Sequence, residues 1–250
     1  MDILDDVSAE GVRTRRFDLA REGSIIPGLL WTPAHATGGR PLVGIGHGAS
    51  GHKAESYVST MGRHLAQAGL AAVAIDGPVH GDRRADGGSD PYLSFLEFSA
   101  AWANDPTVTD ATVADWQHCF DALQQLDDVG PGPLGYWGVS MGTILGLPLV
   151  AAEPRISVAV LGLFGSVGPT ADRICSDAAK VSCPIRFLAQ LDDELFAFDH
   201  VLDLFRLLGT EEKSLHLNPG RHSAVPSAEF FDSGNFLVAH LLGTTTAAGA

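Results

Sequence analysis

Short, continuously apolar segments alternate with longer segments of helical periodicity along this chain, and that alternation constrains its fold more than any other feature. The apolar segments 42–45, 71–75 and 156–161 are typical of strands, and 59–69 and 108–126 carry apolar residues at helical spacing. Strands that are apolar on both faces need cover on both faces, as in a parallel sheet between two layers of helices. The sequence therefore predicts an α/β fold with a mostly parallel central sheet of about eight strands.

The complete set of expected elements follows the same alternation, and no Pro- or Ser-rich linker interrupts it. We therefore predict a single domain over 1–250, with frayed ends at 1–8 and 243–250. Predicted strands are 12–19, 25–31, 42–45, 71–75, 135–139, 156–161, 184–191 and 214–217; predicted helices are 59–69, 108–126, 141–152, 197–208 and 227–242.

Two longer connections interrupt the alternation, at 77–107 and at 162–183. The second has room for a loop and one short helix around 171–179, so we expect a minimal cap and not a multi-helix lid. The first contains aromatic residues that either pack it on the body or wall a cleft, namely Tyr92, Phe95, Phe98 and Trp102.

The charge balance narrows the possible partners. The chain has 16 Lys+Arg against 30 Asp+Glu, a formal net charge of −14. Proteins that bind nucleic acid or anionic membranes carry basic patches, and no Lys/Arg cluster is present here. We therefore expect a small-molecule partner, no nucleic acid and no membrane, in a monomer or a homodimer.

Cysteine usage and the N-terminal sequence bear on the compartment. Cys119, Cys175 and Cys183 are odd in number and lack the spacing of a disulfide framework or a zinc site. The acidic start has no secretory signal features, and the apolar stretches 143–152 and 156–164 are too short to span a bilayer. We expect a cytoplasmic protein without a metal site.

The pentapeptide Gly138-Val139-Ser140-Met141-Gly142 is the strongest chemical signal. It follows a predicted strand and opens a predicted helix, which is the context of a nucleophile elbow. Small residues two positions before and after the serine relieve crowding in so tight a turn. The serine hydroxyl is then exposed at a helix N-terminus, where the helix dipole favours developing negative charge.

Two partners for Ser140 follow in the order acid, then histidine. The predicted strand 184–191 ends at Asp192 and Asp193, and His222 follows the last predicted strand. A histidine can accept the serine proton while a carboxylate fixes its tautomer, so these residues form a candidate catalytic triad. A glycine-rich turn after 42–45 can present the Ala49 amide beside the Met141 amide as an oxyanion hole.

With these motifs in place, the chain resembles the α/β-hydrolase superfamily over nearly its whole length. The segments GHGASGHK, AIDGPVHGDRR, GYWGVSMGT, AQLDDELF and PGRHS carry the resemblance, which is nearest to the dienelactone-hydrolase-like and prolyl-oligopeptidase-like small esterases. In that family the acid lies three residues after a glycine. Gln190 replaces the glycine here, so the same count implies Asp193 and leaves Asp192 as the alternative. The resemblance implies a serine nucleophile in place of the cysteine of true dienelactone hydrolases.

Further residues are candidates for the substrate pocket: His47, His52, His80, Arg83, Phe95, Phe164 and Phe196. The resemblance implies a structural role for His80, and the pair Arg83–Arg84 either binds a substrate carboxylate or is solvated at the surface.

The function expected from these residues is a serine hydrolase that cleaves small carboxylic esters through an acyl-enzyme, with no cofactor. A thioesterase or small-amide hydrolase would use the same triad, and a ligand-binding homologue without activity would use the same scaffold. Because the predicted cap is minimal, we expect short acyl groups of about two to six carbons or a compact aromatic ester, each buried methylene adding only about 0.8 kcal/mol.

Overall fold

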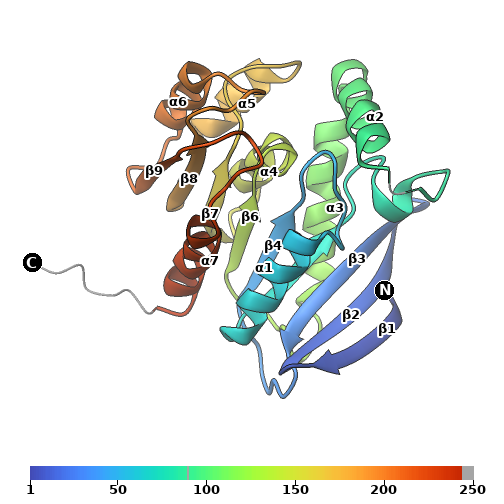
Figure 1. Cartoon of the computed structure of the whole chain (residues 1–250). Coiled ribbons are helices and arrows are strands. Elements are labelled where there is room, and N and C mark those ends of the chain that lie inside the picture. Colours follow the sequence, from blue (N-terminus) through green and yellow to red (C-terminus); the bar gives the residue numbers. More distant parts are fainter. Residues whose placement is uncertain (89, 244–250) are drawn as a thin grey trace, which may run out of the picture.

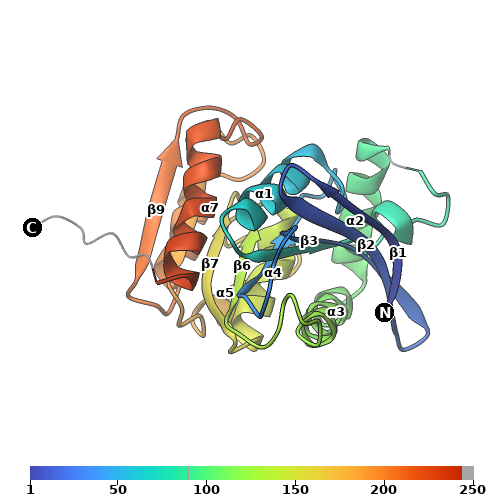
Figure 2. The same ribbon diagram turned by 90° about the horizontal axis from the view of Figure 1, so that it is seen from below.

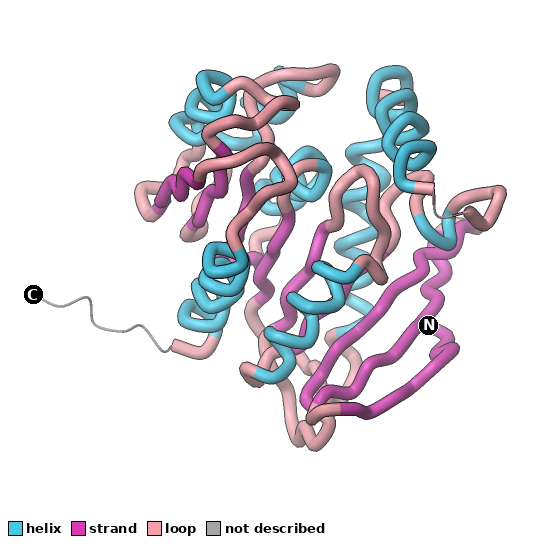
Figure 3. The backbone as a smooth tube through the Cα atoms, viewed as in Figure 1, coloured by secondary structure: helices cyan, strands magenta, loops and turns pink. Residues whose placement is uncertain are grey.

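One nine-stranded sheet runs through the computed structural model, which describes residues 1–88 and 90–243 (Figures 1 and 3). Its strands are β1 (Asp2–Ala9), β2 (Val12–Arg21), β3 (Ser24–Pro33), β4 (Leu42–Gly46), β5 (Ala71–Ile75), β6 (Leu134–Gly138), β7 (Ile156–Gly162), β8 (Ile185–Gln190) and β9 (Lys213–Asn218). They follow the order β1-β2-β3-β5-β4-β6-β7-β8-β9. The pairs among β1, β2, β3 and β5 are antiparallel, and those from β5 through β4 to β9 are parallel. The predicted mostly parallel sheet is confirmed.

Helices cover both faces of this sheet, as the apolar strands required. Figures 1 and 2 show α1 (Ser56–Gln67) and α7 (Ser227–Leu241) side by side on one face. The other face carries α3 (Val108–Leu123), α4 (Met141–Ala152), α5 (Ala171–Ala178) and α6 (Phe198–Leu207), and α2 (Pro91–Asn104) lies above α3 in Figure 1. None of the helices in 1–88 and 90–243 has both the length and the apolarity needed to cross a membrane.

The sheet separates two hydrophobic clusters, and strand alternation decides which residue enters which cluster. On β6, Tyr136 points into the cluster that contains α3 and α4, whereas the next residue, Trp137, points into the cluster beneath α1 and α7. Both aromatic side chains are almost completely buried. Trp137 lies three residues before Ser140 in the sequence, and its side chain is on the face of the sheet that α7 covers.

The N-terminal segment differs from the prediction that residues 1–8 are frayed. These residues form most of β1, which pairs antiparallel with β2. All eight residues of β1 are exposed, so the strand carries no burial pattern that a sequence could reveal. At the other end of the chain Gly243 lies in a turn, and the remainder of the predicted frayed tail lies outside the described residues.

The connection 77–107 contains more regular structure than its sequence suggested. It holds a short 3₁₀ helix, η1 (Gly81–Arg83), followed by the whole of α2. Asp90 caps α2 by accepting the amides of Tyr92 and Leu93, and Pro91 occupies the first turn. The connection 162–183 carries only α5, as expected for a minimal cap.

Candidate active site

Ser140 occupies a strained turn between β6 and α4. Its φ of 59° and ψ of −121° lie in a region that non-glycine residues rarely adopt. The turn is possible because its neighbours are small: a Cβ on Gly142 would lie 2.7 Å from the Gly46 carbonyl oxygen, and one on Gly138 would meet the Tyr136 ring at the same distance. The sequence pattern around the serine thus has a direct steric cause.

The end of β7 holds this turn in place. The amide of Ser140 donates to the Gly162 carbonyl at 2.9 Å. Thr143, fully buried in the first turn of α4, accepts the Gly162 amide through Oγ1 at 2.8 Å, and the same hydroxyl lies 2.7 Å from the Gly162 oxygen and 2.9 Å from the Gly138 oxygen. The position of Ser140 is therefore fixed by hydrogen bonds across two strands.

Three side chains predicted from separate parts of the sequence lie in one hydrogen-bonded row. His222 Nε2 is 3.0 Å from Ser140 Oγ, and His222 Nδ1 is 2.8 Å from Asp193 Oδ2. The Asp193 side chain is 2% exposed and that of His222 is 13% exposed. With Nδ1–H donating to the carboxylate, Nε2 is free to accept the serine proton.

The two neighbouring aspartates have different partners. Asp193 Oδ1 accepts the amides of Leu195 at 2.8 Å and Phe196 at 3.0 Å, which leaves Oδ2 directed at His222. Asp192 instead accepts the Gly220 amide at 3.1 Å and makes no contact with the imidazole. The geometry selects Asp193 over Asp192 as the partner of the histidine.

Two backbone amides near Ser140 are free to bind an oxyanion. Among the described residues, neither the Ala49 nor the Met141 amide has a hydrogen-bond acceptor in the chain. The preceding amide, of Gly48, is already taken by the Tyr57 hydroxyl at 2.7 Å. The Gly48 carbonyl, which belongs to the same peptide as the Ala49 N–H, accepts the Gly51 amide and His47 Nδ1. This peptide is thus oriented before any substrate arrives.

A pocket of about 550 Å³ opens at Ser140 and His222. Its walls come from the β4–α1 loop, the first turns of α1 and α7, and Trp137 of β6, and Phe95 of α2 also borders it. This volume is in the range of pockets that hold drug-sized ligands. The apolar space is therefore larger than the minimal cap suggested, because the gap between α1 and α7 contributes to it.

Comparisons with known proteins bear on the family and the fold of this chain. No protein-family model matches the chain, and no curated protein matches it. A solved cold-adapted esterase from an Arctic intertidal metagenomic library, in its PEG-bound complex, is 39% identical, covers 96% of this chain and 100% of its own, and superposes with a TM-score of 0.87. This chain belongs to the same family of α/β-hydrolase-fold esterases as that protein.

More distant structures share the fold of this esterase. A putative dienelactone hydrolase from Klebsiella pneumoniae is 18% identical over 92% of this chain and 98% of its own, with a TM-score of 0.73. An acetyl xylan esterase from Paenibacillus sp. R4 is also 18% identical, over 96% of this chain and 88% of its own, again with a TM-score of 0.73. Both the recognised family and the predicted α/β-hydrolase fold are confirmed.

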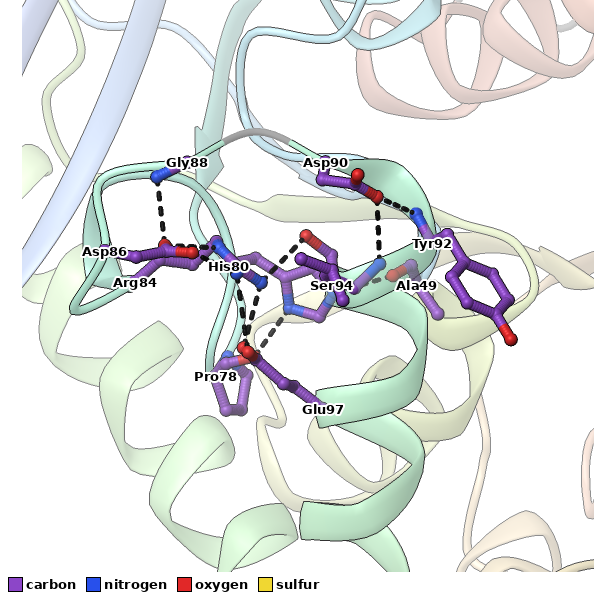
Figure 4. Close-up of polar contacts among 11 residues, drawn as sticks. Ala49, Pro78, His80, Arg84, Asp86, Gly88, Asp90, Tyr92, Ser94 and Glu97 are labelled. Atoms are coloured by element: carbon purple, nitrogen blue, oxygen red, sulfur yellow. Dashed lines mark hydrogen bonds and ion pairs between the residues drawn. The ribbon is translucent and has the colours of Figure 1, made fainter.

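Two histidines predicted to line the pocket instead contact the backbone of the β4–α1 loop and of the segment after β5. His47 is buried, accepts the Gly77 amide through Nε2, and meets His80 edge-on at 4.9 Å. His80 lies between the carbonyl oxygens of Ala49 and Pro78, as Figure 4 shows. Burial lowers the pKa of His47 to about 3 and also lowers the pKa of His80. Both rings hold the loop and face no substrate space.

Arg83 and Arg84 form ion pairs with carboxylates of the protein. They are therefore neither a site for a substrate carboxylate nor a solvated surface pair, the two roles that the sequence suggested. Arg83 pairs with Asp115 at 2.7 Å, so it is not available to the pocket. Arg84 has a side chain only 2% exposed, and its guanidinium forks between Asp86 and Glu97 (Figure 4). Neither arginine can bind a substrate carboxylate without breaking these pairs.

Of the remaining predicted pocket residues, Phe164, Phe196 and His52 lie outside the pocket lining and Phe95 lies in it. Phe164 is completely buried, and the Phe196 ring meets it edge-on with 5.0 Å between ring centroids. The Phe196 ring also lies beside the His222 ring, with 5.6 Å between centroids. His52 borders a separate hollow beside Lys53. Of the seven predicted pocket residues only Phe95 borders the pocket, and sequence reasoning missed the aromatic residues that do, namely Tyr57, Trp137, Phe230 and Phe231.

Proposed function

We propose that this protein is a serine esterase that hydrolyses small, uncharged carboxylic esters through an acyl-enzyme. The observation that carries the proposal is the row Asp193–His222–Ser140, at 2.8 and 3.0 Å, at the mouth of the pocket. Membership of an esterase family supports the same reaction.

The reaction follows from the positions of these groups. Ser140 Oγ attacks the ester carbonyl as His222 Nε2 takes its proton, and Asp193 stabilises the imidazolium that forms. The Ala49 and Met141 amides donate to the oxygen of the tetrahedral intermediate. His222 then protonates the departing alkoxide, which leaves the acyl group on Ser140. Water attacks the acyl-enzyme by the same sequence and releases the acid.

We also infer a small-molecule substrate and a cytoplasmic location. The net charge of −14 opposes binding to nucleic acid or to anionic lipid. Cys119, Cys175 and Cys183 are all free thiols, which is typical of proteins from reducing compartments.

The experiment that tests the proposal combines labelling and turnover. A fluorophosphonate should label the wild type at Ser140, and the label should be absent in Ser140→Ala and strongly slowed in His222→Ala. A panel of acetate esters, thioacetates and acetamides should show ester hydrolysis in the wild type and a loss on the order of 10⁶ in Ser140→Ala. Ester turnover in Ser140→Ala above a few per cent of wild type would refute the assignment.

A further inference from the structure

The first turns of α1 and α7 form part of the pocket wall, and aromatic side chains line the pocket there. Tyr57 of α1 and Phe230 of α7 both contact Trp137 of β6. Trp137 meets Phe230 edge-on at 5.6 Å and Tyr57 at a tilt at 6.3 Å, and Phe230 meets Phe231 edge-on at 5.3 Å. We define Tyr57, Trp137, Phe230 and Phe231 as the aromatic lobe.

The rings of the aromatic lobe are held in fixed orientations. Trp137 Nε1 donates to Ser233 Oγ at 2.8 Å, and Ser233 in turn donates to the Phe230 carbonyl at 2.7 Å. The Tyr57 hydroxyl accepts the Gly48 amide, and burial raises the pKa of this phenol to about 12. The polar edge of the indole is thus occupied within the protein. Trp137 is only 2% exposed, so the surface left for a ligand comes from Tyr57, Phe230 and Phe231, which are half-buried or exposed.

No charged side chain borders the pocket among the described residues that line it. Arg83 and Arg84 are paired elsewhere, as shown above. Arg221, the residue before His222, has a side chain 72% exposed and pairs with Glu194 at 3.2 Å. A ligand carboxylate buried in the lobe would find no cation, and an unpaired buried charge is strongly unfavourable.

We propose that the aromatic lobe is a subsite for an uncharged aromatic group of the substrate. This inference rests on the proposed esterase function and specifies its substrate class. A ligand ring can complete the edge-to-face contacts already present among these side chains. Such contacts favour an aromatic ring over an aliphatic ring of similar area by about two- to tenfold. A dry apolar cavity of about 150 Å³ accommodates benzene, so a pocket of about 550 Å³ has room for a ring and the ester beside it.

The test compares pairs of esters that differ only in the ring. Their hydrolysis is measured by titrating the released acid in a pH-stat. In the acyl arm, methyl 3-phenylpropanoate is compared with methyl 3-cyclohexylpropanoate. In the alcohol arm, benzyl acetate is compared with cyclohexylmethyl acetate. The arm in which the lobe is used should show kcat/KM two- to tenfold higher for the phenyl member. A para-carboxylate on the ring of that member should lower kcat/KM at least tenfold.

Phe230→Leu is the informative variant, because it removes a ring from the lobe and keeps an apolar side chain. The phenyl-to-cyclohexyl ratio should fall to about one. Phe236→Leu, on the same helix but outside the pocket, is the matched control and should keep the wild-type ratio. If Phe230→Leu does not fold, competitive inhibition of the wild type by benzyl alcohol and by cyclohexylmethanol replaces it, with the former expected to bind more tightly.

Three results would overturn the subsite: a ratio of one or less in both arms, an unchanged ratio in Phe230→Leu, or equal turnover of the carboxylate-bearing ester. These differ from failure of the proposed function. In that case the wild type would hydrolyse none of the esters, or Ser140→Ala would hydrolyse them at the wild-type rate.

Discussion

Replacing Asp193 with asparagine should inactivate the enzyme by inverting the tautomer of His222. Asp193 Oδ1 accepts two amides, from Leu195 and Phe196. An asparagine at this position keeps both bonds only if its oxygen stays there, which turns its NH₂ group toward His222 Nδ1. The imidazole must then accept at Nδ1 and carry its proton on Nε2, where it faces Ser140 and cannot act as a base.

The expected loss in kcat is on the order of 10⁴, equivalent to about 5 kcal/mol of transition-state stabilisation. The assay is hydrolysis of benzyl acetate, with fluorophosphonate labelling of Ser140 as a second measurement. Asp192→Asn is the matched control, because its side-chain oxygen can still accept the Gly220 amide. We expect less than about a threefold effect there. A loss below about tenfold in Asp193→Asn, or a larger loss in Asp192→Asn, would refute the tautomer argument.

Further predictions concern stability, pH and thiol reactivity. Thr143→Val should leave the buried Gly162 amide unsatisfied, which costs about 1–3 kcal/mol and lowers Tm by roughly 2–12 °C in a scanning experiment. Folding lowers the pKa of His47 to about 3, so below about pH 6.5 the unfolded chain binds more protons than the folded chain. The free energy of unfolding should therefore fall by about 2–3 kcal/mol by pH 4.5, as denaturant titrations can measure. His47→Gln should show a smaller loss. Burial raises the pKa of Cys183 to about 11, so a thiol reagent at about pH 8 should not modify it before unfolding, as mass spectrometry can check.

The catalytic row could be predicted from sequence because each member is tied to local structure. Ser140 requires a strand before it and a helix after it, and both are evident from apolar spacing; α4 begins and ends where the sequence indicates. Asp193 and His222 each follow a recognisable strand. Since parallel strands present their carboxyl ends at one edge of the sheet, chain order alone brings these residues together.

The pocket could not be predicted in the same way, because its wall depends on how two helices pack. Strand alternation separates Trp137 from Tyr136, but nothing local shows that α7 returns to lie beside α1. Arg84 resembled a surface residue because its partner Glu97 lies on α2, a helix marked in sequence only by its Asp90 cap. β1 was missed because its exposed residues show no apolar period.

The aromatic lobe joins two helices that are far apart in the sequence, α1 at Ser56–Gln67 and α7 at Ser227–Leu241, so the pocket depends on the last helix of the chain. Ser140 precedes His222 by 82 residues, and Phe230 and Phe231 come later still. A chain interrupted after β8 would display the nucleophile turn without a base and without the α7 side of its pocket. A complete site therefore requires α7 as well as the strands that position Ser140 and Asp193.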